Sequence, residues 1–69
     1  MLARSRVIAR GKRIRDVGRL VRTHGGKPSS WLKKASPSFE MAGSTYEYHW
    51  YEHRGIGRVE VKRKQVDIR

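Results

Sequence analysis

The segment from residue 45 to residue 64 constrains the fold of this chain more than any other. Its sequence, TYEYHWYEHRGIGRVEVKRK, places an aromatic run before a turn with two glycines and a basic, β-branched run after it. Side chains in a strand alternate between the two faces of a sheet, so Tyr46, Tyr48 and Trp50 share one face. The two runs and the short segment between them predict an antiparallel hairpin.

Two turns fix the register that we predict for the sheet. A short strand over residues 38–42 precedes the hairpin, with Gly43-Ser44 as its turn. The predicted pairs are His53 with Arg58, Tyr51 with Glu60, Trp50 with Val61, His49 with Lys62, Ala42 with Thr45, Met41 with Tyr46, Glu40 with Glu47 and Phe39 with Tyr48. One face then collects the apolar residues Phe39, Met41, Tyr46, Tyr48, Trp50, Val59 and Val61, which we predict to form the core.

Residues 13–24 carry the clearest helical pattern. Ile14, Val17, Leu20 and Val21 form an apolar stripe at helical spacing, and Gly25-Gly26 ends the helix. For residues 27–36 we predict a connector that contains one helical turn, with Ser29 or Ser30 as its N-cap. Trp31 and Leu32 are expected to face inward. The predicted fold is therefore α+β. An N-terminal helix and a short second helix pack on a three-stranded antiparallel sheet in a single domain over residues 13–69, preceded by a basic arm or helix extension over residues 1–12.

The charge of the chain restricts its partners. Seventeen Lys and Arg against six Asp and Glu give 69 residues a formal charge of +11. This density implies a polyanionic partner, with nucleic acid first, an anionic membrane surface second and an acidic protein third. The chain has no cysteine, its three histidines lack zinc-ligand spacing, and no apolar run approaches the ~20 residues that cross a bilayer. We expect no cofactor, no metal and no membrane span.

The opposite face of the predicted sheet is polar and has His49 at its centre. Its residues are Ser38, Glu40, Glu47, His49, Tyr51, His53, Arg58, Glu60, Lys62 and Lys64. Histidine is the side chain best matched to proton transfer near neutral pH. In RNA cleavage without a metal, one group removes the ribose 2′-hydroxyl proton, another protonates the departing 5′-oxygen, and a cation stabilises the phosphate charge.

We therefore assign roles on this face. His49 is the first candidate for general base or acid, with His53 or Glu47 as its counterpart, and Tyr51 stacks on or hydrogen-bonds a base. The phosphate-binding candidates are Arg58, Lys62, Lys64, Lys33 and Lys34. The predicted pairing of Glu40 with Glu47 brings like charges together, which raises the pKa of a carboxylate when no cation compensates.

Two segments, GRLVRTHGGKPSSWLKKASPSF and YEYHWYEHRGIGRVEVK, resemble the C-terminal toxin domains of bacterial polymorphic toxins of the Rhs type and the contact-dependent inhibition type. The likeness covers residues 18–64. It implies a ribonuclease of the barnase, colicin and RelE-like type, in which a helix packs on an antiparallel sheet whose open face cleaves RNA. It implies delivery to the cytoplasm of a rival cell within a larger effector, and neutralisation by an acidic immunity protein. The site residues that it implies are His49 and Glu52 of the HWYE element, although Glu52 falls on the core side in the predicted register.

Three functions remain open from the sequence. The first is a metal-independent ribonuclease toxin that cleaves tRNA or another structured RNA by attack of the 2′-hydroxyl. The second is a non-catalytic RNA- or DNA-binding module, ribosome-associated or regulatory, and the third is an anionic-surface or protein-interaction module. An imidazole beside carboxylates favours the enzyme, because carboxylates on a nucleic-acid face repel phosphate and a binding module does not need them.

Overall fold

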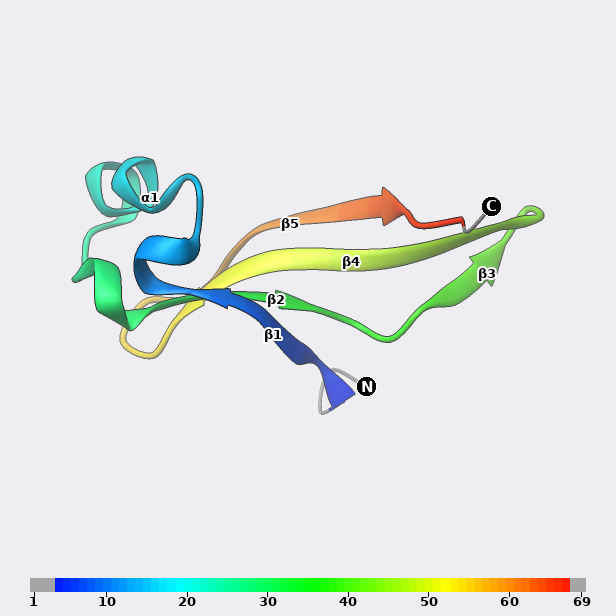
Figure 1. The fold of residues 1–69 in the computed structure, drawn as a ribbon, viewed down its shortest axis with the longest axis horizontal. Coiled ribbons are helices and arrows are strands. Elements are labelled where there is room, and N and C mark those ends of the chain that lie inside the picture. Colours follow the sequence, from blue (N-terminus) through cyan, green and yellow to red (C-terminus); the bar gives the residue numbers. More distant parts are fainter. Residues whose placement is uncertain (1–3, 68–69) are drawn as a thin grey trace.

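A computed structural model describes residues 4–67, which form one antiparallel sheet of five strands and one α-helix (Figure 1). The elements are β1 (Arg6–Arg10), α1 (Val17–His24), β2 (Trp31–Ala35), β3 (Phe39–Met41), β4 (Ser44–His53) and β5 (Gly57–Gln65), with 3-10 turns at Gly11–Arg13 and Pro28–Ser30. The described chain is mostly β. The predicted three-stranded sheet with two helices is therefore wrong, because two further strands join the sheet and the second helix is a single 3-10 turn.

The strand β2 occupies residues that were predicted to be helical. Trp31 and Ala35 are fully buried on one face of the sheet, while Leu32 and Lys34 between them face the other way. This alternation is the period of a strand rather than of a helix, so Trp31 and Leu32 do not face inward together. The single helical turn that was predicted in this segment is present as a 3-10 turn at Pro28–Ser30, just before β2.

The strand β1 lies within the segment that was predicted as a basic arm or helix extension. It pairs antiparallel with β2, and Arg6 lies opposite Ala35. The branched residues Val7 and Ile8 suit an extended backbone. Residues 1–3 of the same segment lie outside the described part of the chain.

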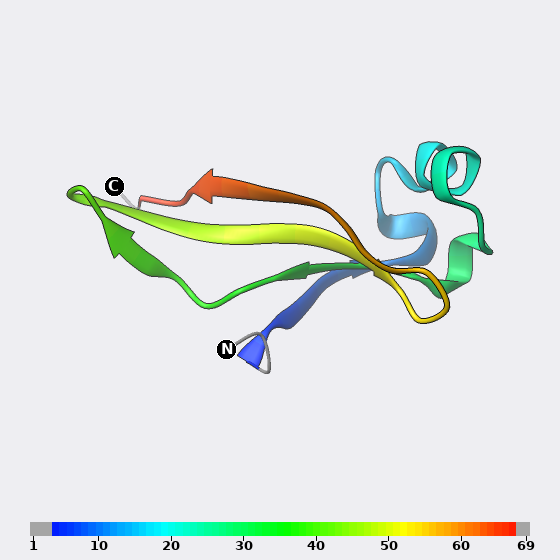
Figure 2. The ribbon, with the colours of Figure 1, turned by 180° about the vertical axis from the view of Figure 1, so that it is seen from behind.

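The strand β4 organises the sheet, because it pairs with β5 on one edge and with β2 and then β3 on the other. The second edge is interrupted at residues 36–38, where Pro37 has no N–H to donate. Ser36 bridges the gap: its N–H donates to the Tyr48 carbonyl at 2.9 Å, and its Oγ accepts from the Tyr48 N–H at 2.9 Å. Figures 1 and 2 show α1 at one end of this long sheet and β3 at the other.

The hairpin of β4 and β5 keeps the predicted register in one half only. His49 lies opposite Lys62, which confirms that pair. Nearer the turn the register changes by one residue, because Glu60 adopts a positive φ of 55° at a bulge. The pairs there are Tyr51 with Val59, Glu52 with Arg58 and His53 with Gly57, so the predicted His53–Arg58 and Tyr51–Glu60 pairs are wrong.

The hairpin of β3 and β4 turns earlier than predicted. Ala42 and Gly43 form a two-residue turn, with φ of 52° and 82°. The pairs are Phe39 with Tyr46, Glu40 with Thr45 and Met41 with Ser44. The predicted pairing of Glu40 with Glu47 is therefore wrong, and like-charge repulsion between these two carboxylates plays no part in the site.

The core lies on the opposite face of the sheet from the one predicted. Ile14 and Leu20 from the helical segment are buried against Trp31, and Tyr51 and Val59 pack around them. We call this side of the sheet the helix face. The other side carries Tyr46, Tyr48 and Trp50, and we call it the aromatic face. Tyr48 and Met41 on that face are each 41% exposed, and of the predicted core residues there only Trp50 is buried.

Two features of the structure place the core on the helix face. Trp31 arrives from the unpredicted strand β2, and the bulge at Glu60 turns Val59 to the side of Tyr51. The helix α1 has eight residues and is therefore about 12 Å long, whereas the molecule extends over 39 Å. Consequently α1 covers one end of the helix face and leaves the rest open.

Candidate functional site

The open part of the helix face holds a small cavity next to the end of the core. The cavity has a volume of about 60 Å³ and is lined by Lys33, His49, Trp50, Tyr51, Glu60, Lys62 and Lys64. These residues come from the adjacent strands β2, β4 and β5, and strand alternation brings most of them to the same side. Of the nine residues predicted for the site, five line this cavity, and a sixth, Glu47, contacts His49 beside it. The five are His49, Tyr51, Lys33, Lys62 and Lys64.

His49 is held by Glu47 at the side of this cavity. The His49 Nε2 lies 3.0 Å from the Glu47 Oε1. The Glu47 carboxylate also accepts hydrogen bonds from two other residues. The Arg6 guanidinium donates to Oε1 at 3.1 Å and to Oε2 at 3.2 Å, and the Ser38 hydroxyl donates to Oε2 at 3.0 Å. A proton on Nε2 is thereby favoured, which leaves Nδ1 as the nitrogen that can accept a proton from a bound molecule.

The Glu47 carboxylate stays ionised because of these contacts. The hydrogen bond with His49 is the largest cause that lowers the pKa of Glu47, and Arg6 and Ser38 lower it further, against the opposing effect of burial. Glu47 is only 8% exposed. A buried, ionised carboxylate that holds an imidazole in one orientation is the arrangement in which a histidine acts as a general base.

Three lysines line the cavity together with the imidazole. Lys62 lies opposite His49 on β5, Lys64 lies opposite Glu47, and the Lys33 ammonium lies 5.8 Å from the centre of the Tyr51 ring. Among residues 4–67, no carboxylate lies within 4 Å of these three ammonium groups. They are therefore available to bind a phosphate.

Tyr51 forms the wall between the cavity and the core. Partial burial raises the pKa of its hydroxyl, with the charge of Asp16 as a smaller cause. The hydroxyl therefore stays protonated at neutral pH and can donate a hydrogen bond to an anionic ligand.

Glu60 closes the cavity on the side of the helix. Its carboxylate accepts two hydrogen bonds from Arg19, at 2.7 and 3.0 Å, and lies 2.8 Å from the His24 Nε2. These contacts, with Arg19 first, lower the pKa of Glu60 to about 2. Glu60 is thus an ionised tether between β5 and α1 rather than an acid that could transfer a proton.

His53, Arg58 and Lys34 do not belong to this site. The His53 ring packs edge-on against Trp31 with 5.2 Å between the ring centres, and its Nδ1 accepts a hydrogen bond from the Gly55 N–H at 3.0 Å. This contact with the core makes His53 a structural residue. Its predicted role as the counterpart of His49 in proton transfer has no support in the geometry.

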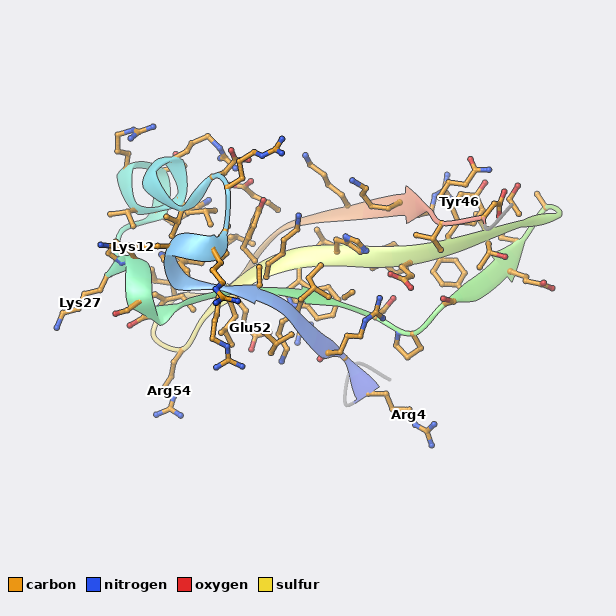
Figure 3. All side chains as sticks on the ribbon, in the orientation of Figure 1. Arg4, Lys12, Lys27, Tyr46, Glu52 and Arg54 are labelled. Carbon is orange, nitrogen blue, oxygen red and sulfur yellow. The ribbon has the colours of Figure 1, made fainter. Side chains whose placement is uncertain are left out.

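Arg58 and Lys34 lie on the aromatic face, where both contact Glu52. The Arg58 Nε lies 3.7 Å and the Lys34 Nζ 3.6 Å from a Glu52 oxygen. In Figure 3, Glu52 is labelled among the side chains below the strands, with α1 above them. His49 and Glu52 of the HWYE element therefore lie on opposite faces of the sheet. Glu52 belongs to the aromatic face, which the helix does not cover.

Arg6 and the Glu60 cluster were not foreseen from the sequence. Arg6 reaches Glu47 because β1 joins the sheet. The sequence feature that could have predicted this strand is the pair of β-branched residues, Val7 and Ile8, that follows Arg6. Glu60 meets Arg19 and His24 because of the bulge, for which the sequence offers no comparable signal.

Neither a cluster of possible metal ligands nor a membrane-spanning helix is found among the described residues. Within residues 4–67, no three His, Asp or Glu side chains gather closely enough to hold a metal ion. No helix there combines the length and the apolar character that crossing a bilayer requires. Comparison of this chain with models of protein families, with curated proteins and with solved structures gave no match.

Proposed function

We propose that this protein is a metal-independent ribonuclease whose site is the cavity at His49. One observation carries the proposal: an imidazole held by a buried, ionised carboxylate stands among three lysines that have no carboxylate partner in residues 4–67. This is the set of groups that attack by a 2′-hydroxyl on a phosphodiester requires.

The residues of the cavity suggest a division of the chemistry. His49 Nδ1 takes the proton of the ribose 2′-hydroxyl, whose oxygen attacks phosphorus while the bond to the 5′-oxygen breaks. Lys33, Lys62 and Lys64 stabilise the charge that grows on the phosphate. A lysine ammonium or the Tyr51 hydroxyl returns a proton to the 5′-oxygen, in place of His53. The products are a 2′,3′-cyclic phosphate and a 5′-hydroxyl.

The biological role that we propose follows the resemblance to polymorphic toxin domains. The chain would act in the cytoplasm of a target cell after delivery within a larger effector, and tRNA or another structured RNA would be its substrate. A cognate immunity protein with an acidic surface would neutralise it, because carboxylates can pair with the three lysines that otherwise bind phosphate.

Non-catalytic binding of RNA or DNA is the second candidate, and a specific observation favours it. Within residues 4–67, His49 is the one imidazole that lines the cavity, because His53 packs on Trp31 and His24 is paired with Glu60. The two carboxylates, Glu47 and Glu60, are already paired with arginines of the same chain. Their presence therefore needs no catalytic explanation, and the lysines alone could bind a phosphate backbone.

Incubation of the purified protein with total RNA in EDTA separates these candidates. The matched variants are His49→Gln, whose amide can still hydrogen-bond Glu47 but accepts no proton, and Lys27→Ala, which removes a charge away from the cavity. Discrete cleavage by the wild type and by Lys27→Ala, with loss of cleavage in His49→Gln, is the expected result. Intact RNA that is retarded on a gel in a salt-dependent manner would instead favour the binding module.

A further inference from the structure

The aromatic face carries a row of rings interleaved with guanidinium groups. Tyr46, Tyr48 and Trp50 follow one another on β4, roughly 7 Å apart as alternate residues of a strand. The Arg63 guanidinium lies 4.8 Å from the Tyr46 ring centre, and the Arg58 guanidinium lies 5.2 Å from the Trp50 ring centre. Tyr46 lies toward the end of the sheet that is far from α1 (Figure 3).

Of this row only Trp50 is buried, at 2% exposure beneath Arg58, and it lies on the face opposite the main core cluster. The core cluster lies on the helix face, and the rings of the aromatic face pack mainly on one another and on arginines. Phe39 stacks on Tyr48 with 5.2 Å between the ring centres and 25° between the planes. Tyr48 is nevertheless 41% exposed, which leaves part of a large ring in water in the middle of the row.

We propose that the aromatic face binds single-stranded nucleic acid by stacking bases on the rings of Phe39, Tyr46 and Tyr48 and on the guanidinium planes of Arg63 and of Arg58, which covers the buried Trp50. Single strands are bound by aromatic side chains on which successive bases stack, together with cations that follow the backbone. Arginine serves both purposes, because its guanidinium plane stacks on a base and its charge attracts phosphate. The Tyr48 ring, flanked by Arg63 across the hairpin, is the exposed centre of such a surface.

Charge selects nucleic acid over the other possible occupants of this face. A second copy of the chain packed face to face would bring Arg58 and Arg63 against their own counterparts, in a protein of formal charge +11. Glu52, the carboxylate of β4 on this face, is already paired with Lys34 and Arg58 and does not offset the remaining positive charge. A polyanion with flat apolar groups matches both features of the surface.

This inference stands apart from the proposed cleavage, because the two sites lie on opposite faces of the sheet and binding needs no catalysis. The test uses an all-deoxy oligonucleotide of eight thymidines, which has no 2′-hydroxyl to react. Its affinity is measured by fluorescence anisotropy for the wild type, Tyr48→Phe, Tyr48→Leu and Val61→Ala. Val61 is 54% exposed and neighbours Lys62 on β5, so its variant controls for loss of apolar surface. Thermal unfolding verifies that each variant is folded.

We expect Tyr48→Leu to weaken binding about tenfold, while Tyr48→Phe and Val61→Ala bind as the wild type does. A duplex of the same length should compete poorly, because its bases are not free to stack. Equal affinity of Tyr48→Leu and the wild type would overturn the proposal. So would concentration-dependent dimerisation that Tyr48→Leu abolishes, or binding to anionic lipid vesicles that depends on Val61, since each would identify a different occupant.

Discussion

At the scale of single residues, the site depends on how the His49 imidazole is held. Glu47 holds Nε2, and Arg6 and Ser38 hold Glu47 in turn, so two strands, β1 and β4, and the link before β3 fix one ring. Alternation along β4 was enough to predict that Glu47, His49 and Tyr51 share a face. It could not predict Arg6, which enters from a strand far away in the sequence.

Glu47→Gln tests the role of the carboxylate in positioning His49. A neutral amide neither fixes the tautomer with a proton on Nε2 nor stabilises the imidazolium, so we expect cleavage to fall toward the level of His49→Gln. The measurement is the cleavage rate of Glu47→Gln, of His49→Gln and of the variant that carries both changes. The double variant should cleave no more slowly than His49→Gln, because Glu47 acts only through the imidazole. A folded Glu47→Gln protein that cleaves at the wild-type rate would show that Glu47 does not act through His49.

Glu60→Gln tests the tether between β5 and α1. The pKa of Glu60 is about 2 in the folded state against 4.5 for the free group, so its contribution to stability is present above pH 4.5 and is lost as the pH falls toward 2. We expect Glu60→Gln to lower the free energy of unfolding at pH 7 by about 2 kcal/mol. Denaturant titrations at pH 7 and pH 3 check this. A loss of stability that is equal at both pH values would contradict an ionic cause.

At the scale of elements, irregular backbone decides which residues meet. The predicted register of the β4–β5 hairpin holds at His49 and Lys62 and changes toward the turn, where Glu60 bulges. A bulge depends on what the extra residue contacts in three dimensions, here Arg19 and His24, so the sequence pattern alone could not reveal it. The face that carries the core was misassigned for a related reason. Both faces of β4 carry aromatic residues, and Trp31 of β2 decides between them.

Substitutions in the turn between β3 and β4 should change the stability of the protein in opposite directions. Ala42 and Gly43 both have positive φ, which suits the Asn-Gly pair of two-residue hairpin turns and disfavours alanine. We expect Ala42→Asn to increase the free energy of unfolding by about 0.5–1 kcal/mol, and Gly43→Ala to decrease it by about 1 kcal/mol. Thermal unfolding of both variants tests this. A destabilised Ala42→Asn protein would contradict the turn geometry described above.

At the scale of the whole molecule, a small core supports a sheet that is open on much of both faces. The helix covers one end, so the remaining surface is available to a polyanion on the side of His49 and on the side of Tyr48. Composition was sufficient to predict a polyanionic partner. It could not show how the cations divide between two faces. That division depends on strand β2, which was not predicted and which turns Lys33 and Lys34 to different faces, and on the bulge in β5, which moves Arg58 to the aromatic face.

The salt dependence of RNA binding tests the electrostatic part of this account. Each phosphate contact of a single strand contributes about 0.7 to the slope of log affinity against log salt concentration. We expect Lys62→Ala to reduce the slope by about this amount and Lys27→Ala, near the helix end of the molecule, to change it much less. Anisotropy with a 2′-O-methyl oligonucleotide between low and physiological salt gives the slopes. Equal slopes for the two variants would show that the positive charge acts only as a diffuse field.

Cleavage of a DNA oligonucleotide that contains one ribonucleotide tests the central claim most directly. Attack by a 2′-hydroxyl predicts a single cut after the ribonucleotide in EDTA, a 2′,3′-cyclic phosphate on the 5′ fragment, and no cut by His49→Gln. The all-deoxy oligonucleotide should remain intact. A cut in the all-deoxy strand, or a cut that persists in His49→Gln, would contradict the assignment of His49 as the base in a metal-independent ribonuclease.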